Sequence, residues 1–255
     1  KYTIDSDGNF VVMQGDEFIL PLGNAYYNGT LVSTEVASIP KVIDTNKLGT
    51  TLVTYAYEGA KTQIKVKVID GVSPSIPQVV LRYNNKNGNQ YTGEWYSGNI
   101  YQEFKSTDYT KENLKGSGID YYEICTEKVC DKNNSNVWKK LTSNNRTDGN
   151  NGIHTYSVRS VDKNGNVSEA NSYTFSIDKE PPTCKLTVVS GTKGNGKWYK
   201  SNIEIGWEEG YPDGTVSDVL TSTKMPVAIT SPVEDKKVTA QVTDEAGNIS
   251  MCDIT

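Results

Sequence analysis

A five-residue pattern that occurs twice limits most strongly what this chain can fold into. Residues 162–166 and 244–248 both read Asp-x-x-Gly-Asn, and each is followed by a β-branched residue and Ser. The neighbouring segments 173–177 and 238–242 alternate apolar with polar residues, as half-buried antiparallel strands do. The pattern predicts the same closing hairpin in two places, and such internal repetition indicates tandem modules.

A second repeat relates the same two parts of the chain. Residues 93–100 and 196–203 share the pattern Gly-x-Trp-Tyr-x-x-Asn-Ile. Because a buried Trp commonly anchors a β-sandwich, Trp95 and Trp198 are predicted to be core residues.

A third repeat marks the joints between modules. Segments 68–74 and 176–182 each end a strand-like run with Ile-Asp and then reach a Pro. Pro fixes its own φ and favours extended backbone before it, so these joints are expected to be semi-rigid spacers. A chain of 255 residues is also too long for one sandwich of about 100 residues. The predicted domains are residues 1–70, 71–180 and 181–255, in an elongated arrangement in which only neighbours touch.

Composition and turn signals favour strands over helices. Tyr is frequent, with 16 residues, and its apolar ring and polar hydroxyl suit the thin core of a sandwich. Dipeptides that accept the positive φ of hairpin turns stand between several strand-like runs. They are Asn28-Gly29, Asn87-Gly88, Asp148-Gly149, Asn151-Gly152 and Asp213-Gly214. The expected fold class is all-β, with three tandem immunoglobulin-like β-sandwich domains.

Charge and hydropathy exclude several classes of partner. The chain has 26 Lys and Arg against 31 Asp and Glu, which gives a net charge of −5, and it has no dense basic run. Nucleic acid is therefore not expected as a partner. Its apolar stretches are short, so this chain is expected not to insert into a membrane. Because the sequence starts without Met and stops on a strand-like segment, we expect a piece of a longer protein. We expect this piece to be a monomer.

The assembled motifs resemble bacterial immunoglobulin-like repeat domains of secreted and cell-surface proteins. In the first domain, segments 15–18, 44–50 and 53–55 carry the resemblance. In the other two domains it rests on the Trp-Tyr-x-x-Asn-Ile strands, the Asp-x-x-Gly-Asn turns and residues 117–122. The resemblance implies an extracellular protein, secreted or attached to the cell wall or surface. Members of this group serve as adhesins, spacers and accessory modules of glycan-degrading enzymes, so it leaves the activity open.

The chain departs from the family pattern in two places. The third domain has residues 213–217 where the second has Ser-Gly-Ile at 117–119. The first domain lacks the Asp-x-x-Gly-Asn turn before its last strand. Residues 5–9 fit the spacing but lie at the other end of that domain, so we interpret them as a chance hairpin.

Four cysteines are predicted to form two disulfides, Cys125–Cys130 across a short hairpin and Cys184–Cys252 between the first and last strands of the third domain. An even number of cysteines in loop-rich β-modules favours disulfides and an oxidising compartment. The alternative is four free thiols. A zinc site is not expected, because the Cys-x-x-x-x-Cys spacing is too wide and the only histidine, His154, lies elsewhere.

No combination of residues predicts catalysis, so we expect a protein that is not an enzyme. His154 has no second His and no nucleophile motif near it, and it is interpreted as a hydrogen-bonded strand residue. Glu208 and Glu209 are sequence neighbours, whereas glycoside hydrolysis needs two carboxylates that face each other across a cleft.

The turn residues are interpreted as structural. They are Asp162, Gly165, Asn166, Asp244, Gly247 and Asn248. In this interpretation each Asp side chain caps a tight turn whose Gly has positive φ. The alternative is that each turn binds calcium through its Asp and Asn oxygens, but each offers few ligands. We therefore assign no metal and expect no cofactor, with calcium as the one alternative.

One aromatic group is a candidate ligand contact. Trp138 lies in the polar run 133–140, near Tyr121 and Tyr122, and an exposed ring flanked by Asn and Lys can stack on a sugar. The alternative is a core residue at a strand edge. A Lys–Asn isopeptide bond cannot be placed from sequence.

Two functions remain. The first is a non-catalytic structural and adhesive stalk of a bacterial surface protein, with a host glycan or matrix protein as its partner. The second is an accessory carbohydrate-binding or spacer region of a secreted glycan-degrading enzyme.

Overall fold

The computed structural model describes residues 2–110 and 113–255, and their regular secondary structure is almost entirely β-strand. The described residues include no α-helix, and η2 (Ser135–Val137) is a single 3₁₀ turn. Two compact units divide the chain. The first comprises Lys1–Gln78, Phe104–Asn144 and Ser157–Asn171, and the second Val79–Glu103, Asn145–Tyr156 and Ser172–Thr255.

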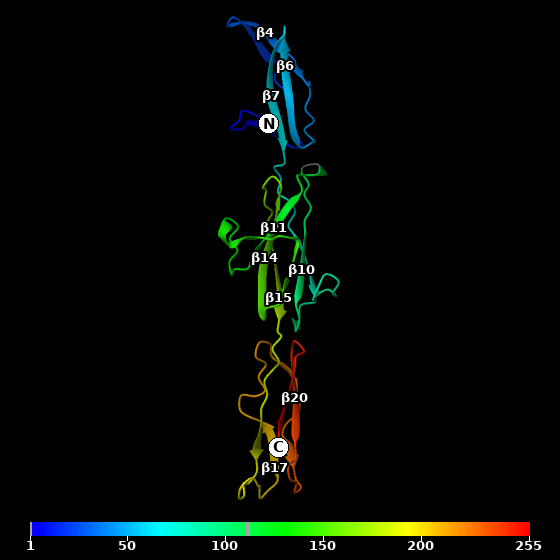
Figure 1. Ribbon diagram of the computed structural model, residues 1–255, viewed down its shortest axis with the longest axis vertical. Coiled ribbons are helices and arrows are strands. Elements are labelled where there is room, and N and C mark those ends of the chain that lie inside the picture. Colours follow the sequence, from blue (N-terminus) through cyan, green and yellow to red (C-terminus); the bar gives the residue numbers. More distant parts are fainter. Residues whose placement is uncertain (1, 111–112) are drawn as a thin grey trace. The chain divides into compact units, whose positions relative to one another are not determined.

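Seven strands within residues 1–70 form two sheets. They are β1 (Tyr2–Ile4), β2 (Phe10–Met13), β3 (Gly23–Tyr27), β4 (Thr30–Val36), β5 (Ser38–Ile39), β6 (Gly49–Tyr57) and β7 (Ala60–Ile69). One sheet has the order β1-β2-β7-β6-β5, with β6 and β7 as long antiparallel neighbours (Figure 1), and the other is the hairpin β3-β4. Strand β7 buries Val66 and Val68 and exposes the alternating lysines, because successive side chains point to opposite faces. Val36 of β4 joins the same core as Val66.

Eight strands lie within residues 71–180. They are β8 (Gln78–Tyr83), β9 (Trp95–Tyr96), β10 (Ile100–Lys105), β11 (Ile119–Cys125), β12 (Lys139–Lys140), β13 (Asn145–Asp148), β14 (Gly152–Asp162) and β15 (Asn171–Ile177). Their sheets have the orders β13-β10-β8 and β12-β11-β14-β15-β9. Phe175 and Ile177 of β15 are fully buried on one face of their strand.

Six strands lie within residues 181–255. They are β16 (Leu186–Ser190), β17 (Ile203–Trp207), β18 (Val219–Ser222), β19 (Val227–Ile229), β20 (Val238–Asp244) and β21 (Ile249–Ile254). One sheet has the order β16-β17-β19 and the other β18-β20-β21. Leu186 and Ile205 of the first sheet share a core with Val238 and Ala240 of the second. This is sheet-on-sheet packing in which each strand contributes its alternate residues.

The structure confirms the predicted all-β fold of tandem sandwich modules. The strands of every sheet come from only one of the ranges 1–70, 71–180 and 181–255. The two compact units divide the chain differently, so the domain boundaries stay a prediction.

The predicted core role of Trp198 is wrong. Trp95 and Tyr96 form β9, which pairs with β15, and Trp95 is half-buried there. Trp198 occupies the same place in the repeat but lies in a turn outside the named strands, and it is 60% exposed. The segment around Trp198 has the same local sequence but forms none of the named strands, so the Trp198 side chain is not packed into a sheet core.

Candidate functional site

The two Asp-x-x-Gly-Asn turns share two side-chain hydrogen bonds between their Asp and their Asn. The Oδ1 atom of Asp162 accepts from the backbone amides of Asn164 and Asn166, both at 2.8 Å, and its Oδ2 accepts from the Asn166 side chain at 2.7 Å. Asp244 accepts from the amide of Asn248 at 2.8 Å and from its side chain at 2.9 Å. Each Asp therefore holds its turn closed by satisfying backbone groups locally.

A third turn, the hairpin at residues 5–9, has the same bonds between its Asp and its Asn. Asp5 accepts from the backbone amide of Asn9 at 2.8 Å and from its side chain at 3.0 Å. This turn joins β1 to β2. The hydrogen bonds from Asn9 lower the pKa of Asp5.

At the first joint, the turn also binds the preceding linker. Asp70 directly follows β7, and its backbone carbonyl accepts from the side chain of Asn166 at 3.1 Å. Its carboxylate accepts from the backbone amides of Ser117 at 2.8 Å and Val72 at 3.0 Å. We call Asp70, Ser117, Asp162 and Asn166 the first joint.

The second joint repeats this arrangement with Asp178, Ser217, Asp244 and Asn248. The carbonyl of Asp178 accepts from the side chain of Asn248 at 3.0 Å. Its carboxylate accepts from the amides of Ser217 at 2.9 Å and Glu180 at 2.8 Å. Asp178 and Asp244 are both fully buried. Each linker Asp is therefore held by the same kinds of group.

Sequence reasoning used the linker aspartates only as boundary markers and missed their contacts. The signal was present, since both joints end their strand with Ile-Asp at 69–70 and 177–178. The matching serines, Ser117 and Ser217, stand 100 positions apart in segments that differ in sequence, and this divergence hid their equivalence.

Trp138 is buried, as the interpretation of a core residue at a strand edge requires and that of a free ring does not. It is 6% exposed, its indole Nε1 donates to the carbonyl of Asp131 at 2.9 Å, and the guanidinium of Arg159 lies 4.2 Å from the ring centre. Polar neighbours in the sequence do not prevent burial when an Arg covers the ring. A buried ring covered in this way is not free to stack on a sugar.

The two tyrosines near Trp138 are placed differently. Tyr122 is buried and packs 5.9 Å from the ring of Phe104. Tyr121 is half-buried, and the ammonium of Lys140 lies 3.6 Å above its ring. Neither ring forms an open stacking surface with Trp138, and ligand contact by these residues stays a prediction.

Both predicted disulfides are present, Cys125–Cys130 and Cys184–Cys252. No described cysteine is free. Such bonds persist in oxidising compartments, which indicates an extracellular protein. None of the described helices is long and apolar enough to cross a membrane.

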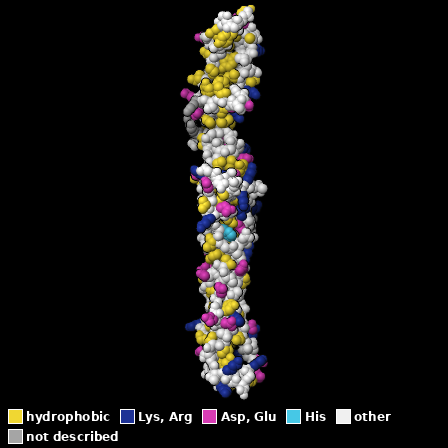
Figure 2. All heavy atoms as spheres, turned by 90° about the vertical axis from the view of Figure 1, so that its left-hand side faces the viewer, with side chains coloured by type: hydrophobic (Ala, Val, Ile, Leu, Met, Phe, Trp, Pro, Cys, Tyr) yellow, Lys and Arg dark blue, Asp and Glu magenta, His cyan; other side chains and the backbone are white. Residues whose placement is uncertain are grey.

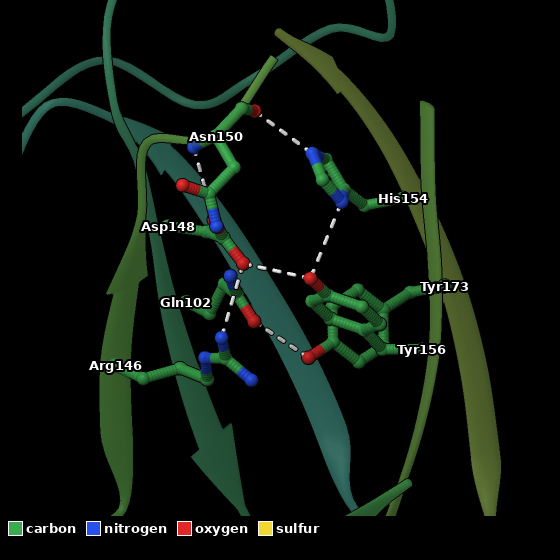
Figure 3. Close-up of polar contacts among 7 residues, drawn as sticks. All are labelled: Gln102, Arg146, Asp148, Asn150, His154, Tyr156 and Tyr173. Carbon is green, nitrogen blue, oxygen red and sulfur yellow. Dashed lines mark hydrogen bonds and ion pairs between the residues drawn. The ribbon is translucent and has the colours of Figure 1, made fainter. Parts of the chain in front are cut away.

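A buried polar network surrounds Asp148 (Figure 3). The carboxylate accepts from the hydroxyl of Tyr156 at 2.8 Å and from the guanidinium of Arg146 at 3.0 Å. Burial alone would raise the pKa of Asp148, but these donors and the amide of Asn150 lower it below its ordinary value. Burial and the bond to Asp148 raise the pKa of Tyr156 to about 12, so its hydroxyl stays a donor at neutral pH.

His154 completes this network. Its Nε2 lies 2.8 Å from the carbonyl of Asn150, and its Nδ1 lies 3.2 Å from the Tyr156 hydroxyl (Figure 3). It is the single histidine, coloured cyan in Figure 2, and it reaches the surface of the face shown there. The ring is a hydrogen-bonded strand residue on β14, as interpreted from sequence. Basic and acidic side chains lie interspersed on the same face, where no continuous basic patch is visible (Figure 2).

Lys179 and Asn99 lie close together, as the two partners of an isopeptide bond do, but they lack the buried setting and the acid that such a bond needs. The ammonium of Lys179 donates to Asn99 Oδ1 and to the carbonyl of Gly149, both at 2.7 Å. This contact is exposed, and among the described contacts no carboxyl group bridges the two residues. It is therefore described as a hydrogen bond.

Two hollows are open to solvent. One, of about 580 Å³, is lined by Tyr83, Asn84, Asn85, Asn87, Gly88, Asn89 and Tyr96. The rings of Tyr83 and Tyr96 lie 4.5 Å apart, and the side chain of Asn84 donates to the Tyr96 hydroxyl at 2.6 Å. The other, of about 870 Å³, lies beside the β3-β4 hairpin and includes the exposed Tyr26 and Tyr27.

Comparison with known proteins found no matching family model and no matching curated protein. Among solved structures, the fibronectin(III)-like modules of CbhA from Clostridium thermocellum align at 14% identity and a TM-score of 0.28, over 70% of this chain and 94% of that one. Three titin domains align at 12% and 0.30, over 96% and 82%. Domains 7, 8 and 9 of the S-layer protein SbsC align at 14% and 0.24, over 89% and 72%. Scores this low carry no conclusion about function, and the resemblance to bacterial immunoglobulin-like repeats stays a prediction.

Proposed function

We propose that this chain is a non-catalytic structural segment of an extracellular surface protein, in which the joints fix the orientation of successive sandwich modules. The observation that carries the proposal is the repeated binding of a linker Asp. At both joints, the carboxylate of the Asp and its carbonyl accept from the same kinds of donor, namely a Ser amide and a turn Asn. A linker that served only as a tether would not need these bonds.

The energies of these bonds are sufficient to order a short linker. A hydrogen bond to a charged group contributes about 1.5–3 kcal/mol, against a backbone ordering cost of about 1–2 kcal/mol per residue. The carboxylates of Asp70 and Asp178 each accept at least two backbone amides. Pro near each joint has already lost part of its conformational freedom, which lowers the cost further.

The test compares two matched Asn variants. Asn166→Ala removes a bond within its turn and the bond to the Asp70 carbonyl, whereas Asn9→Ala removes only the equivalent bond within its turn. Spin labels are placed at the exposed residues Thr62 and Asp120. They are attached through a noncanonical amino acid so that both disulfides stay intact. Double electron–electron resonance then measures the distribution of distances between the two labels. The measurement is made in EDTA.

We expect a narrow distribution in the unsubstituted chain and in Asn9→Ala, and a broader one in Asn166→Ala. A distribution in the unsubstituted chain as broad as that of Asn166→Ala would show a flexible tether and contradict the proposal.

A second candidate function, glycan binding, is favoured by the hollow that Tyr83 and Tyr96 help to line. Two aromatic rings and four amide side chains, with no charged group among the lining residues, suit a neutral sugar that stacks on one face and hydrogen-bonds at its edge. Screening a glycan panel with the unsubstituted chain and Tyr96→Ala tests this function. Tyr109→Ala removes an exposed Tyr outside the hollow and is the control. Saturable binding lost only in Tyr96→Ala supports a glycan site, and no binding across the panel excludes it for those sugars.

A further inference from the structure

Three buried carboxylates meet at the first joint. Asp70 follows β7, Asp108 follows β10 and Asp162 ends β14. They are 2%, 7% and 1% exposed, and one oxygen from each lies within 4.8 Å of the other two. Like charges buried this close together destabilise the fold unless a bound cation or a retained proton neutralises them.

No side chain in the described part of the chain supplies that charge. None of its Lys or Arg residues forms an ion pair with these three carboxylates. The ammonium of Lys163 lies 3.8 Å from where a Cβ at Gly118 would be, without such an ion pair. Burial raises the pKa of Asp108, against a hydrogen bond from the Gly118 amide, and the charges of Asp70 and Asp162 raise it further.

Two oxygen atoms at this place have no hydrogen-bond partner. Asp108 Oδ1 and Ser117 Oγ are both buried and unpartnered. A Cβ at Gly116 would lie 2.6 Å from Asp70 Oδ2 and 2.7 Å from Asp108 Oδ1, so the missing side chain leaves open the space that these two oxygens face. Buried acceptors without a donor are rare in proteins, and they indicate a bound ion or water.

The second joint offers a comparison, because among the described residues no third carboxylate joins Asp178 and Asp244 there. There the hydroxyl of Ser217 donates to Asp178 Oδ2 at 2.6 Å, whereas the hydroxyl of the equivalent Ser117 makes no such bond. Among the described residues, only the first joint brings three acidic ligands together. The difference between two otherwise matched joints therefore lies where a cation would bind.

We propose that Asp70, Asp108 and Asp162 bind a Ca²⁺ ion at the first joint. Carboxylate and hydroxyl oxygens are the ligands that hard cations prefer, and Ca²⁺ takes them at about 2.3–2.6 Å. Ligand oxygens around Ca²⁺ can then lie up to about 4.6–5.2 Å apart, so three oxygens within 4.8 Å of one another fit around it. Mg²⁺ demands near-ideal octahedral geometry and gives up its water reluctantly, so we expect Ca²⁺ to be preferred. Ser117 Oγ and water complete the coordination.

The ion would connect the linker to two loops of the following module. Asp70 belongs to the linker, whereas Asp108 and Asp162 come from residues 71–180. The site does not depend on the proposed function, because a bound ion would stabilise this joint whether or not the chain is a stalk. Extracellular modules bind Ca²⁺ with a Kd of about 10⁻⁴–10⁻³ M, which is the range expected here.

Calorimetric titration of the EDTA-treated and dialysed full chain with CaCl₂, together with its thermal melting temperature, tests the proposal. We expect saturable binding of one Ca²⁺ and a melting temperature that rises with Ca²⁺ more than with Mg²⁺. Asp108→Asn should lose both effects. It keeps an oxygen to accept from the Gly118 amide, and in EDTA it should melt no lower than the unsubstituted chain because one negative charge is gone.

Asp244→Asn changes the second joint and is the matched control, which should keep the full response to Ca²⁺. The proposal is overturned if the chain shows no saturable binding up to about 10 mM Ca²⁺, well above the Kd of extracellular modules. It is also overturned if Asp108→Asn binds as tightly as the unsubstituted chain, if Asp244→Asn loses binding equally, or if Mg²⁺ gives the same rise. The spin-label measurement across the first joint is made in EDTA, so the proposed structural function and the proposed Ca²⁺ site can each fail without the other.

Discussion

Ser117 and Asp70 are separated by 47 residues, yet the backbone amide of Ser117 donates a 2.8 Å hydrogen bond to the Asp70 carboxylate. Ser217 and Asp178 make the same contact at 2.9 Å. The hydroxyls differ, because Ser217 Oγ donates to Asp178 Oδ2 whereas Ser117 Oγ is buried without a partner. The two joints therefore share the backbone hydrogen bond to the linker carboxylate, but only at the second joint does the Ser hydroxyl also donate to it.

This difference predicts that replacing Ser by Ala lowers stability at the second joint but has little effect at the first. Ser217→Ala should lower the free energy of unfolding by about 1–3 kcal/mol, because the buried Asp178 carboxylate loses a charged hydrogen bond. Ser117→Ala in EDTA should change it by less than about 0.5 kcal/mol, since its hydroxyl donates to no carboxylate. Differential scanning calorimetry is the appropriate measurement, because a chain of several modules need not unfold in one transition. Equal effects of the two variants would contradict the distinction between the joints.

Two tryptophans in polar surroundings should behave differently on truncation. Trp138→Ala should cost about 3–5 kcal/mol, as large core truncations do, because the indole is buried beneath Arg159. Trp198→Ala should change stability by no more than about 0.5 kcal/mol, because that ring is mostly exposed. Chemical denaturation followed by circular dichroism measures both variants, and a large loss in Trp198→Ala would indicate that its ring is buried in solution.

Features that depend on neighbouring residues could be predicted from the sequence. The alternation of Ile64, Val66 and Val68 with lysines predicts a half-buried strand, and β7 covers those residues. The preference of Asn and Gly for positive φ predicts the Asn28-Gly29 turn, and both have positive φ, but Gly88, Gly149 and Gly214 of three other predicted turn dipeptides do not. For β7 and the Asn28-Gly29 turn, the local sequence determines the conformation.

Features that depend on which loops meet could not be predicted. Asp70, Asp108 and Asp162 are distant in the sequence, and no local pattern indicates that they share one space. The burial of Trp138, which follows the 3₁₀ turn η2, depends on Arg159 of β14. The repeat that contains Trp95 and Trp198 predicted equal roles, but only Trp95 has a partner strand. Tertiary contacts decided these three outcomes.

The two disulfides should differ in their contribution to stability. Replacing Cys184 and Cys252 by Ser opens a link between residues 68 positions apart, and chain entropy gives a loss of about 4 kcal/mol. Replacing Cys125 and Cys130, which are 5 positions apart, should cost about 2 kcal/mol. Denaturant unfolding of the two double variants, each with the other disulfide intact, measures the difference. A larger loss at the shorter link would show that loop length does not set the order.

The network around Asp148 predicts a pH-dependent contribution to stability. The folded state lowers the pKa of Asp148 below its ordinary value, because the donors from Tyr156, Asn150 and Arg146 outweigh burial. The folded state therefore binds fewer protons than the unfolded state near that pKa. The stabilisation is fully present above the unfolded value of about 3.9, and it is lost as pH falls through the folded pKa. Tyr156→Phe removes the 2.8 Å bond to Asp148 and should cost about 1–3 kcal/mol at neutral pH.

The pH profile separates this electrostatic effect from a loss of packing. The difference between the unsubstituted chain and Tyr156→Phe should shrink as the pH is lowered, because protonation of Asp148 removes the charge that the hydroxyl stabilises. Tyr173→Phe is the control, since its hydroxyl donates to Gln102 at 2.6 Å and touches no carboxylate in the drawn network (Figure 3). Burial keeps the pKa of Tyr173 far above neutrality, so the cost of this variant should stay constant with pH. Unfolding free energies measured from pH 7 down to about 3 test both expectations. A constant difference for Tyr156→Phe would mean that its hydroxyl does not stabilise the charge on Asp148.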